Sequence, residues 1–153
     1  MTARILKLLV TTVAAAFTLA ACSSNEAPPE NHPEPASARL FDAATHTELP
    51  QPYALPSGAT TRIEVHYYGV DGADITNDLI ADHYSSLTFA PTSFATVASV
   101  TGLRFQHDVT VDAAPAAASD LLIGWGHDEL ADELSFGPCA VTASGGAQAE
   151  SHP

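Results

Sequence analysis

Hydrophobic and polar side chains alternate through the middle of the chain, as they do in strands that bury one face. In residues 62–68, Ile63, Val65 and Tyr67 fall on one face, while charged and polar side chains occupy the other. Similar alternating or β-branched runs occupy residues 86–90, 95–100, 103–111, 121–125 and 136–142, and a further strand is expected near Leu40 or Tyr53. About seven short antiparallel strands, separated by turn signals, predict an all-β sandwich.

The start of the chain has the order of an export signal. Arg4 and Lys7 precede an uncharged apolar run that is shorter than the about 20 residues needed to span a bilayer. The run ends in Leu19-Ala20-Ala21-Cys22, which resembles the lipobox of bacterial lipoprotein signal peptides. This resemblance implies that a signal peptide, 1–21, is removed and that Cys22 is lipid-modified. The alternative is an ordinary secretory signal.

Anchoring through Cys22 implies that the mature chain lies in the cell envelope, tethered to a membrane by its lipid. Ser23 follows the cysteine. By resemblance to Gram-negative lipoproteins it implies sorting to the outer membrane, if the cell has one. Residues 22–37 are rich in Pro and Glu and predict a disordered tether, and residues 144–153 predict a disordered tail. The folded domain is therefore expected at 38–143.

The order of the strand signals in 38–143 resembles that of Ig-like domains on bacterial surface lipoproteins, which implies an Ig-like β-sandwich. The antibody pattern of two cysteines around a core tryptophan is absent, since Cys22 belongs to the anchor and Trp125 lies on the penultimate strand. Cys139 is interpreted as a small buried apolar residue. A reactive thiol is the alternative, although nothing nearby in sequence would lower its pKa.

Composition restricts the partners of this domain. The 153 residues include 5 Lys+Arg and 18 Asp+Glu, a formal net charge of -13. Loss of the signal leaves 3 basic residues against 18 acids, a net charge of −15. No nucleic-acid partner is expected, because such binding needs a cationic surface. The acidic surface either attracts cations or keeps the domain soluble, and the 2 Cys exclude a disulfide framework.

Common catalytic signatures are missing. The sequence holds no G-x-S-x-G elbow, H-E-x-x-H pair, phosphate loop or dinucleotide-binding motif. Residues 71–82 begin and end with acids but lack the oxygen ligands and glycine of a calcium loop. We therefore predict a protein that is not an enzyme, with no catalytic residues.

Histidines gather where strand direction brings strand ends together. If successive strands are antiparallel, the strand 62–68 ends where the strand after His83 begins and where the strand through Trp125 ends. The prediction is that His66, His83 and His127 share this end, with Asp128 and Glu129 nearby. Imidazole and carboxylate groups suit Zn²⁺ or Cu²⁺. The alternative is that the histidines cap sheet hydrogen bonds and the loop acids are simply solvated.

Two neighbouring expectations complete the site. In residues 126–134, Leu130 and Leu134 are four residues apart, and the acids of this segment also recur at intervals of four. In a helix this spacing would put the leucines and the acids on different faces, which predicts a short helical cap. His107 has inward parity and is predicted to be a core histidine with a hydrogen-bond partner. His32, His46 and His152 are assigned no role.

Two functions are favoured by these observations, ahead of an unrecognised hydrolase, which would need a pocket that joins a nucleophile to a histidine. The first is a lipid-anchored envelope lipoprotein with a non-catalytic Ig-like domain that binds or spaces an unknown protein or another envelope component. The second is a periplasmic or surface metal-binding protein that holds Zn or Cu through the His/carboxylate cluster at one end of the sandwich.

Overall fold

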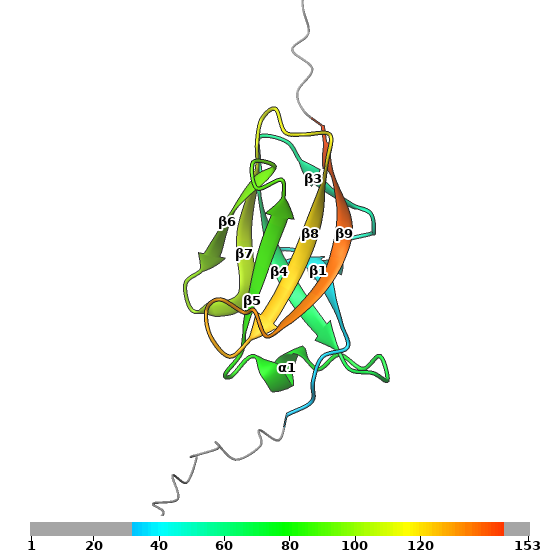
Figure 1. Ribbon diagram of the computed structural model, residues 1–153, viewed down its shortest axis with the longest axis vertical. Coiled ribbons are helices and arrows are strands. Elements are labelled where there is room, and N and C mark those ends of the chain that lie inside the picture. Colours follow the sequence, from blue (N-terminus) through cyan, green and yellow to red (C-terminus); the bar gives the residue numbers. More distant parts are fainter. Residues whose placement is uncertain (1–31, 146–153) are drawn as a thin grey trace, which may run out of the picture. The chain divides into compact units, whose positions relative to one another are not determined.

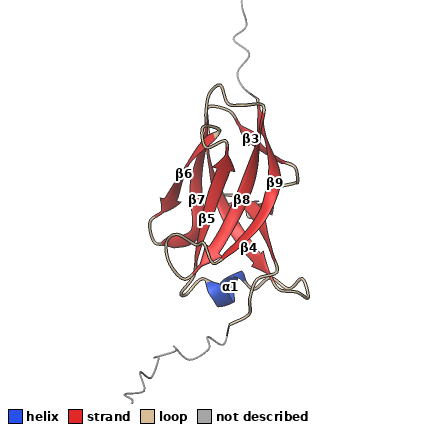
Figure 2. Ribbon diagram, viewed as in Figure 1, coloured by secondary structure: helices blue, strands red, loops and turns tan. Residues whose placement is uncertain are grey.

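The computed structural model describes residues 32–145, and strands make up most of them. One sheet has the order β2-β1-β4-β7-β6 and the other the order β3-β9-β8-β5 (Figures 1 and 2). The elements are β1 (Ser37–Asp42), β2 (Thr47–Glu48), β3 (Tyr53–Pro56), β4 (Thr60–Tyr68), α1 (Thr76–Leu79), β5 (Tyr84–Ala90), β6 (Ala95–Val100), β7 (Leu103–Val111), β8 (Ala118–Gly126) and β9 (Leu134–Ser144).

This connectivity confirms the predicted Ig-like sandwich. Read across the sheets, β1-β4-β7-β6 corresponds to the A-B-E-D sheet of that fold, and β9-β8-β5 corresponds to G-F-C. The described residues form nine strands instead of about seven. Strand β2 adds a short hairpin to β1, and β3 pairs in parallel with β9, with Tyr53 opposite Val141. The parallel pair arises because the chain leaves the first sheet after β2 and joins the edge of the second.

The core lies between the sheets and follows the predicted alternation. Ile63, Val65 and Tyr67 of β4 are completely buried, as the sequence pattern predicts. The Tyr67 hydroxyl donates to the carbonyl oxygen of Gly124 across the sandwich at 2.6 Å. Burial raises the pKa of Tyr67, so this hydroxyl remains a donor and ties the two layers together.

Cys139 on β9 is partly buried and packs against the edge of the core. Burial raises the pKa of its thiol. A raised pKa reduces the thiolate fraction at neutral pH, so the structure favours the packing role over a reactive thiol.

The predicted helical cap at 126–134 is wrong. Residues 127–133 form a turn, and Leu130 is 71% exposed. The Asp128 carboxylate accepts the Leu130 amide hydrogen at 2.9 Å, and its carbonyl oxygen accepts the Ala131 amide hydrogen at 3.0 Å. These local bonds compete with a helix, and Ala131 adopts a positive φ of 48° that ends any helical run.

The predicted signal peptide and Cys22 lie outside the described residues, as do residues 22–31 of the predicted tether and 146–153 of the predicted tail. The rest of the tether region runs into the domain. Pro35 is buried, and the Ala36 amide donates to the carbonyl oxygen of Tyr68 at 2.8 Å. In the described part of the chain, no helix is both long and apolar enough to cross a membrane.

Candidate metal centre

The lower end of the sandwich is where β4 and β8 end, β5 begins and α1 lies (Figure 1). Strands β5 and β8 are antiparallel neighbours, and Tyr84 pairs with Gly126. His83 immediately precedes β5 and His127 immediately follows β8. The two histidines are therefore held side by side by the sheet register.

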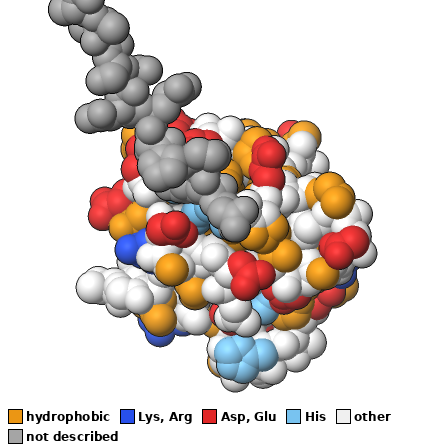
Figure 3. All heavy atoms as spheres, turned by 90° about the horizontal axis from the view of Figure 1, so that it is seen from below, with side chains coloured by type: hydrophobic (Ala, Val, Ile, Leu, Met, Phe, Trp, Pro, Cys, Tyr) orange, Lys and Arg blue, Asp and Glu red, His pale blue; other side chains and the backbone are white. Residues whose placement is uncertain are grey.

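Three histidines converge at this lower end. One potential ligand atom from each of His32, His83 and His127 lies within 4.8 Å of the other two. The ring centroids of His83 and His127 are 4.0 Å apart, and that of His32 lies 4.4 Å from His83 and 5.4 Å from His127. Acidic side chains surround this end, with histidine visible between them (Figure 3).

His83 is the most enclosed member of this histidine cluster, with a fully buried side chain. Its Nδ1 donates to the Asp82 carboxylate at 2.6 Å, and the carbonyl oxygen of Leu79 lies 3.2 Å away. The Trp125 indole stacks on the ring at 4.4 Å between centroids. Nε2 is buried and has no hydrogen-bond partner among residues 32–145. A buried lone pair without a donor is costly, and a metal ion would satisfy it.

His127 is oriented in the same way. Its Nδ1 lies 2.8 Å from both carboxylate oxygens of Glu133, and its backbone amide donates to the same carboxylate at 3.1 Å. With Nδ1 occupied, the lone pair of the neutral ring is on Nε2. A carboxylate on the outer nitrogen fixes the tautomer and orientation of metal-binding histidines.

The same hydrogen bonds set the charge of the two carboxylates. Desolvation is the largest single influence on Asp82 and opposes its ionisation, but the hydrogen bond from His83 and the electrostatic effect of the three neighbouring histidines together lower the pKa of Asp82. The pKa of Glu133 is lowered chiefly by the backbone and side-chain hydrogen bonds from His127. Both groups are thus anionic at neutral pH and complement a bound cation.

His32 is the member that the sequence analysis missed. It precedes β1, and β1 begins beside the end of β4, where Ser37 pairs with Tyr68. The residues before β1 therefore lead onto the lower end of the sandwich. The expected strand near Leu40 was the only available signal, and it could have placed His32 there only together with the pairing of β1 and β4, which the sequence did not predict.

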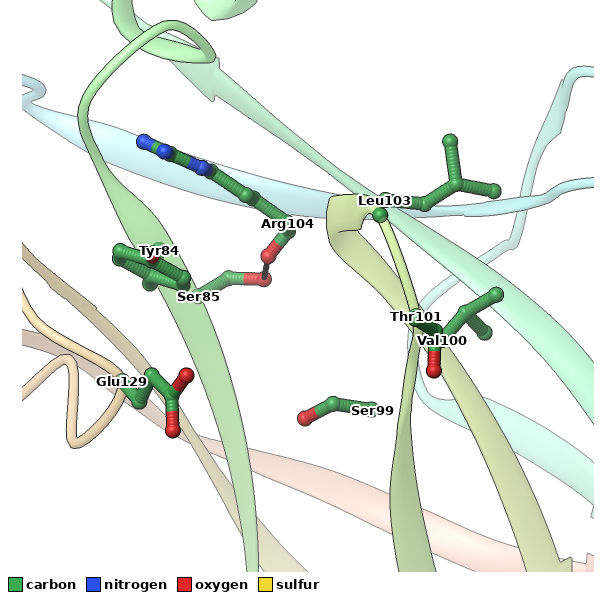
Figure 4. Close-up of a pocket in the computed structure, with 9 residues that line it drawn as sticks. Tyr84, Ser85, Ser99, Val100, Thr101, Leu103, Arg104 and Glu129 are labelled. Carbon is green, nitrogen blue, oxygen red and sulfur yellow. Dashed lines mark hydrogen bonds between the residues drawn. The ribbon is translucent and has the colours of Figure 1, made fainter.

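The other predicted site residues lie elsewhere. His66 is on the outer face of β4, where its Nδ1 lies 2.8 Å from an Asp74 carboxylate oxygen. Asp128 is used in the turn described above. Glu129 lines a hollow of about 350 Å³ between β5 and the β6–β7 turn (Figure 4). Within residues 32–145, the three-histidine group includes none of them.

The same hollow is lined by Ser85, which contacts a second buried histidine. His107 is 1% exposed, as predicted for a core histidine, and its Nε2 lies 2.7 Å from the Ser85 hydroxyl oxygen. Burial lowers the pKa of His107 to about 4. Its Nδ1 has no partner among the described residues, so the carboxylate that orients the histidine of a catalytic triad is not supplied there.

No protein-family model, curated protein or solved structure matches this chain. Ig-like sandwiches host many unrelated functions, so the fold does not select among them. Function must be argued from the chemistry of the histidine cluster.

Proposed function

We propose that this protein is a lipid-anchored envelope protein whose Ig-like domain binds Cu²⁺ or Zn²⁺ through His32, His83 and His127. The observation that carries the proposal is the convergence of three imidazoles, two of which have a carboxylate on Nδ1. This arrangement matches the carboxylate–histidine–metal pattern of natural sites.

The ligand set favours borderline divalent metals. Imidazole nitrogen suits Cu²⁺, Zn²⁺ and Ni²⁺, whereas Cu⁺ prefers sulfur. The only methionine of the chain is Met1, and Cys139 is the only cysteine among the described residues. In the Irving–Williams order Cu²⁺ binds more tightly than Zn²⁺, so we expect Cu²⁺ to displace Zn²⁺.

The geometry of the histidine cluster allows a metal ion to enter and leave. In a tetrahedral site with bonds of about 2.0–2.1 Å, neighbouring ligand atoms lie about 3.4 Å apart, so the cluster needs to tighten modestly from its 4.8 Å limit. Three protein ligands leave one coordination position for water or another donor. The side chain of His127 is 35% exposed, which gives an ion a route from solvent.

Trp125 provides an internal probe for this proposal. It is the only tryptophan of the chain and stacks on His83. Bound Cu²⁺ should quench its fluorescence because a paramagnetic ion nearby opens non-radiative decay, whereas closed-shell Zn²⁺ should not. We expect saturable quenching by Cu²⁺ of the full-length protein in detergent, and prior saturation with Zn²⁺ should shift the titration to higher Cu²⁺ concentration.

A matched pair of variants tests the assignment. His127→Ala should weaken the quenching strongly, whereas His107→Gln, which changes a histidine outside the cluster, should leave it intact. The metal proposal fails if calorimetry finds no saturable heat with either ion, or if both variants bind as the unchanged protein does.

The lipid anchor is a separate part of the proposal and rests on the Leu19-Ala20-Ala21-Cys22 motif. Metabolic labelling with a fatty-acid analogue should mark the wild-type protein and not Cys22→Ala. Equal labelling of the two would show that Cys22 is not the anchor. If the anchor is confirmed and no ion binds, the alternative function remains a non-catalytic domain that binds or spaces another envelope component.

A further inference from the structure

We propose a second transition-metal site on the outer face of the five-stranded sheet, formed by Glu64, His66 and His46, with Asp74 orienting His66. It takes Zn²⁺ or Cu²⁺ and is independent of the histidine cluster at the lower end. Its occupancy therefore does not depend on the outcome at the first site.

The backbone places two of these ligands on one surface. Glu64 and His66 are two residues apart on β4, so both side chains leave the same face of the sheet. In the neighbouring strand, Phe41 pairs with Glu64 and Arg39 with His66. The Phe41 ring stacks on the His66 imidazole with 4.1 Å between centroids and fixes its plane.

The third ligand comes from the turn between β1 and β2. The Asp42 carboxylate accepts the amide hydrogens of Ala44 and Thr45 at 3.0 and 2.9 Å, and its carbonyl oxygen accepts the amide of His46 at 2.8 Å. These bonds fold the turn back over the sheet. His46 Nδ1 consequently lies 3.2 Å from Glu64 Oε2.

Two of the three pairs of ligand atoms, those that include Glu64, have spacings that suit a metal ion. The same Oε2 lies 3.2 Å from His46 Nδ1 and 3.7 Å from His66 Nε2. These distances bracket the about 3.4 Å expected between neighbouring ligand atoms of a tetrahedral zinc site. Among the described residues, only the lower-end cluster has three ligand atoms within 4.8 Å of one another, so the His46 ring must turn toward His66 to bring all three ligands of the second site onto one ion. Its side chain is 73% exposed, so little packing resists the turn.

His66 has the features of an oriented ligand. Its Nδ1 lies 2.8 Å from Asp74 Oδ2, and burial of Asp74 opposes ionisation while hydrogen bonds from Thr76 and His66 lower its pKa. The ionised carboxylate keeps the proton of the neutral ring on Nδ1. Nε2 is buried and has no hydrogen-bond partner in the described part of the chain, although it points toward the Glu64 carboxylate.

Stoichiometry tests this second site. With Zn²⁺ in calorimetry, we expect two equivalents for the full-length protein and one for His66→Ala. We expect one for Glu64→Gln as well, a variant that keeps the side-chain shape. Glu48→Gln is a matched control, because Glu48 is an exposed acid of the same sheet paired with Arg39, and it should retain two equivalents. Millimolar Ca²⁺ should not compete, since a site built on imidazole disfavours it.

Failure of the second site is distinguishable from failure of the first. If only the first site is absent, Cu²⁺ does not quench Trp125 in the unchanged protein, which still binds one equivalent of Zn²⁺ that His66→Ala removes and His83→Ala retains. The second site is disproved if His66→Ala and Glu64→Gln both bind as many ions as the unchanged protein, or if His83→Ala binds none.

Discussion

Two buried histidines of this domain have opposite surroundings. His83 at the lower end and His107 between the sheets are 0% and 1% exposed, and each has one ring nitrogen without a hydrogen-bond partner among the described residues. The other nitrogen of His83 meets the Asp82 carboxylate, whereas that of His107 meets the Ser85 hydroxyl. His83 lies against two further imidazoles, and His107 belongs to the inter-sheet core.

The difference shows that burial alone does not indicate a ligand. A neutral hydroxyl partner and an apolar setting keep His107 uncharged, with its pKa lowered to about 4 by burial. The Asp82 carboxylate instead gives His83 an anionic partner, and the neighbouring imidazoles supply further nitrogen donors, which together favour a cation. We therefore interpret His107 as a structural histidine and His83 as the central ligand of the proposed metal site.

The largest expected effect separates these roles. His83→Ala should reduce Cu²⁺ affinity by more than about 100-fold, because loss of a ligand should exceed the 10–100-fold effect of losing an outer-shell partner. His107→Gln should leave affinity within about twofold, since within residues 32–145 the histidine cluster does not include it. Competition titrations monitored by Trp125 fluorescence measure both. Equal losses in the two variants would remove the distinction.

The next effect is a pH dependence of stability that belongs to His107. The unfolded chain protonates this histidine near pH 6.5, but the folded chain does so only near pH 4. The stabilisation is therefore complete above pH 6.5 and is lost as pH falls toward 4. The difference between these two pKa values corresponds to about 3 kcal/mol in the free energy of unfolding, of which about 2 kcal/mol should disappear between pH 7.5 and 5.

Urea unfolding of wild type and His107→Gln, both with chelator, isolates this contribution. The difference between their pH slopes cancels the titration of every other group. If the two slopes coincide between pH 7.5 and 5, His107 is not protonated on unfolding and its core role needs revision.

The sandwich was predictable because its strands bury alternate residues, and Ile63, Val65 and Tyr67 follow that rule without exception. Strand direction then brought His83 and His127 to one end, which requires only the order of the strands. His66 was predicted to lie with them because the prediction used the direction of each strand but not the sheet to which the strand belongs. It leaves the outer face of β4, whereas His83 and His127 flank strands of the opposite sheet.

Two features lay beyond sequence patterns. His32 reaches the cluster through the pairing of β1 with β4, in a proline-rich stretch with no periodicity of its own. The turn at 127–133 carries a helical spacing of leucines, but the Asp128 side chain captures the Leu130 amide instead. Local side-chain bonds of this kind override periodicity in a segment too short to form a stable helix.

A smaller effect concerns the carboxylates that distinguish His83 from His107. Asp82→Asn and Glu133→Gln should each lower Cu²⁺ affinity by about 10–100-fold, because the imidazole loses an anionic partner and becomes a weaker ligand. Asp78→Asn is a suitable control, since Asp78 lies on α1 and contributes no group to the cluster. Calorimetry at pH 7 measures these affinities. Unchanged affinity in both test variants would mean that the carboxylates stabilise the loops and do not tune the ligands.

The smallest effect tests how the turn at 127–133 holds His127 beside His83. A Cβ at Gly124 would approach the Ala131 carbonyl oxygen and the Ser86 hydroxyl more closely than real Cβ atoms do. Gly124→Ala should therefore push the turn away from β8, at a cost of about 1–3 kcal/mol typical of overpacking. Gly102→Ala is the control, because no atom lies within 4 Å of its added Cβ, although its φ of 79° adds strain of its own. If the turn positions His127, Gly124→Ala should weaken Cu²⁺ quenching of Trp125 and Gly102→Ala should not. Normal quenching in a destabilised Gly124→Ala protein would mean that Glu133 and the end of β8 are enough to hold the ligand in place.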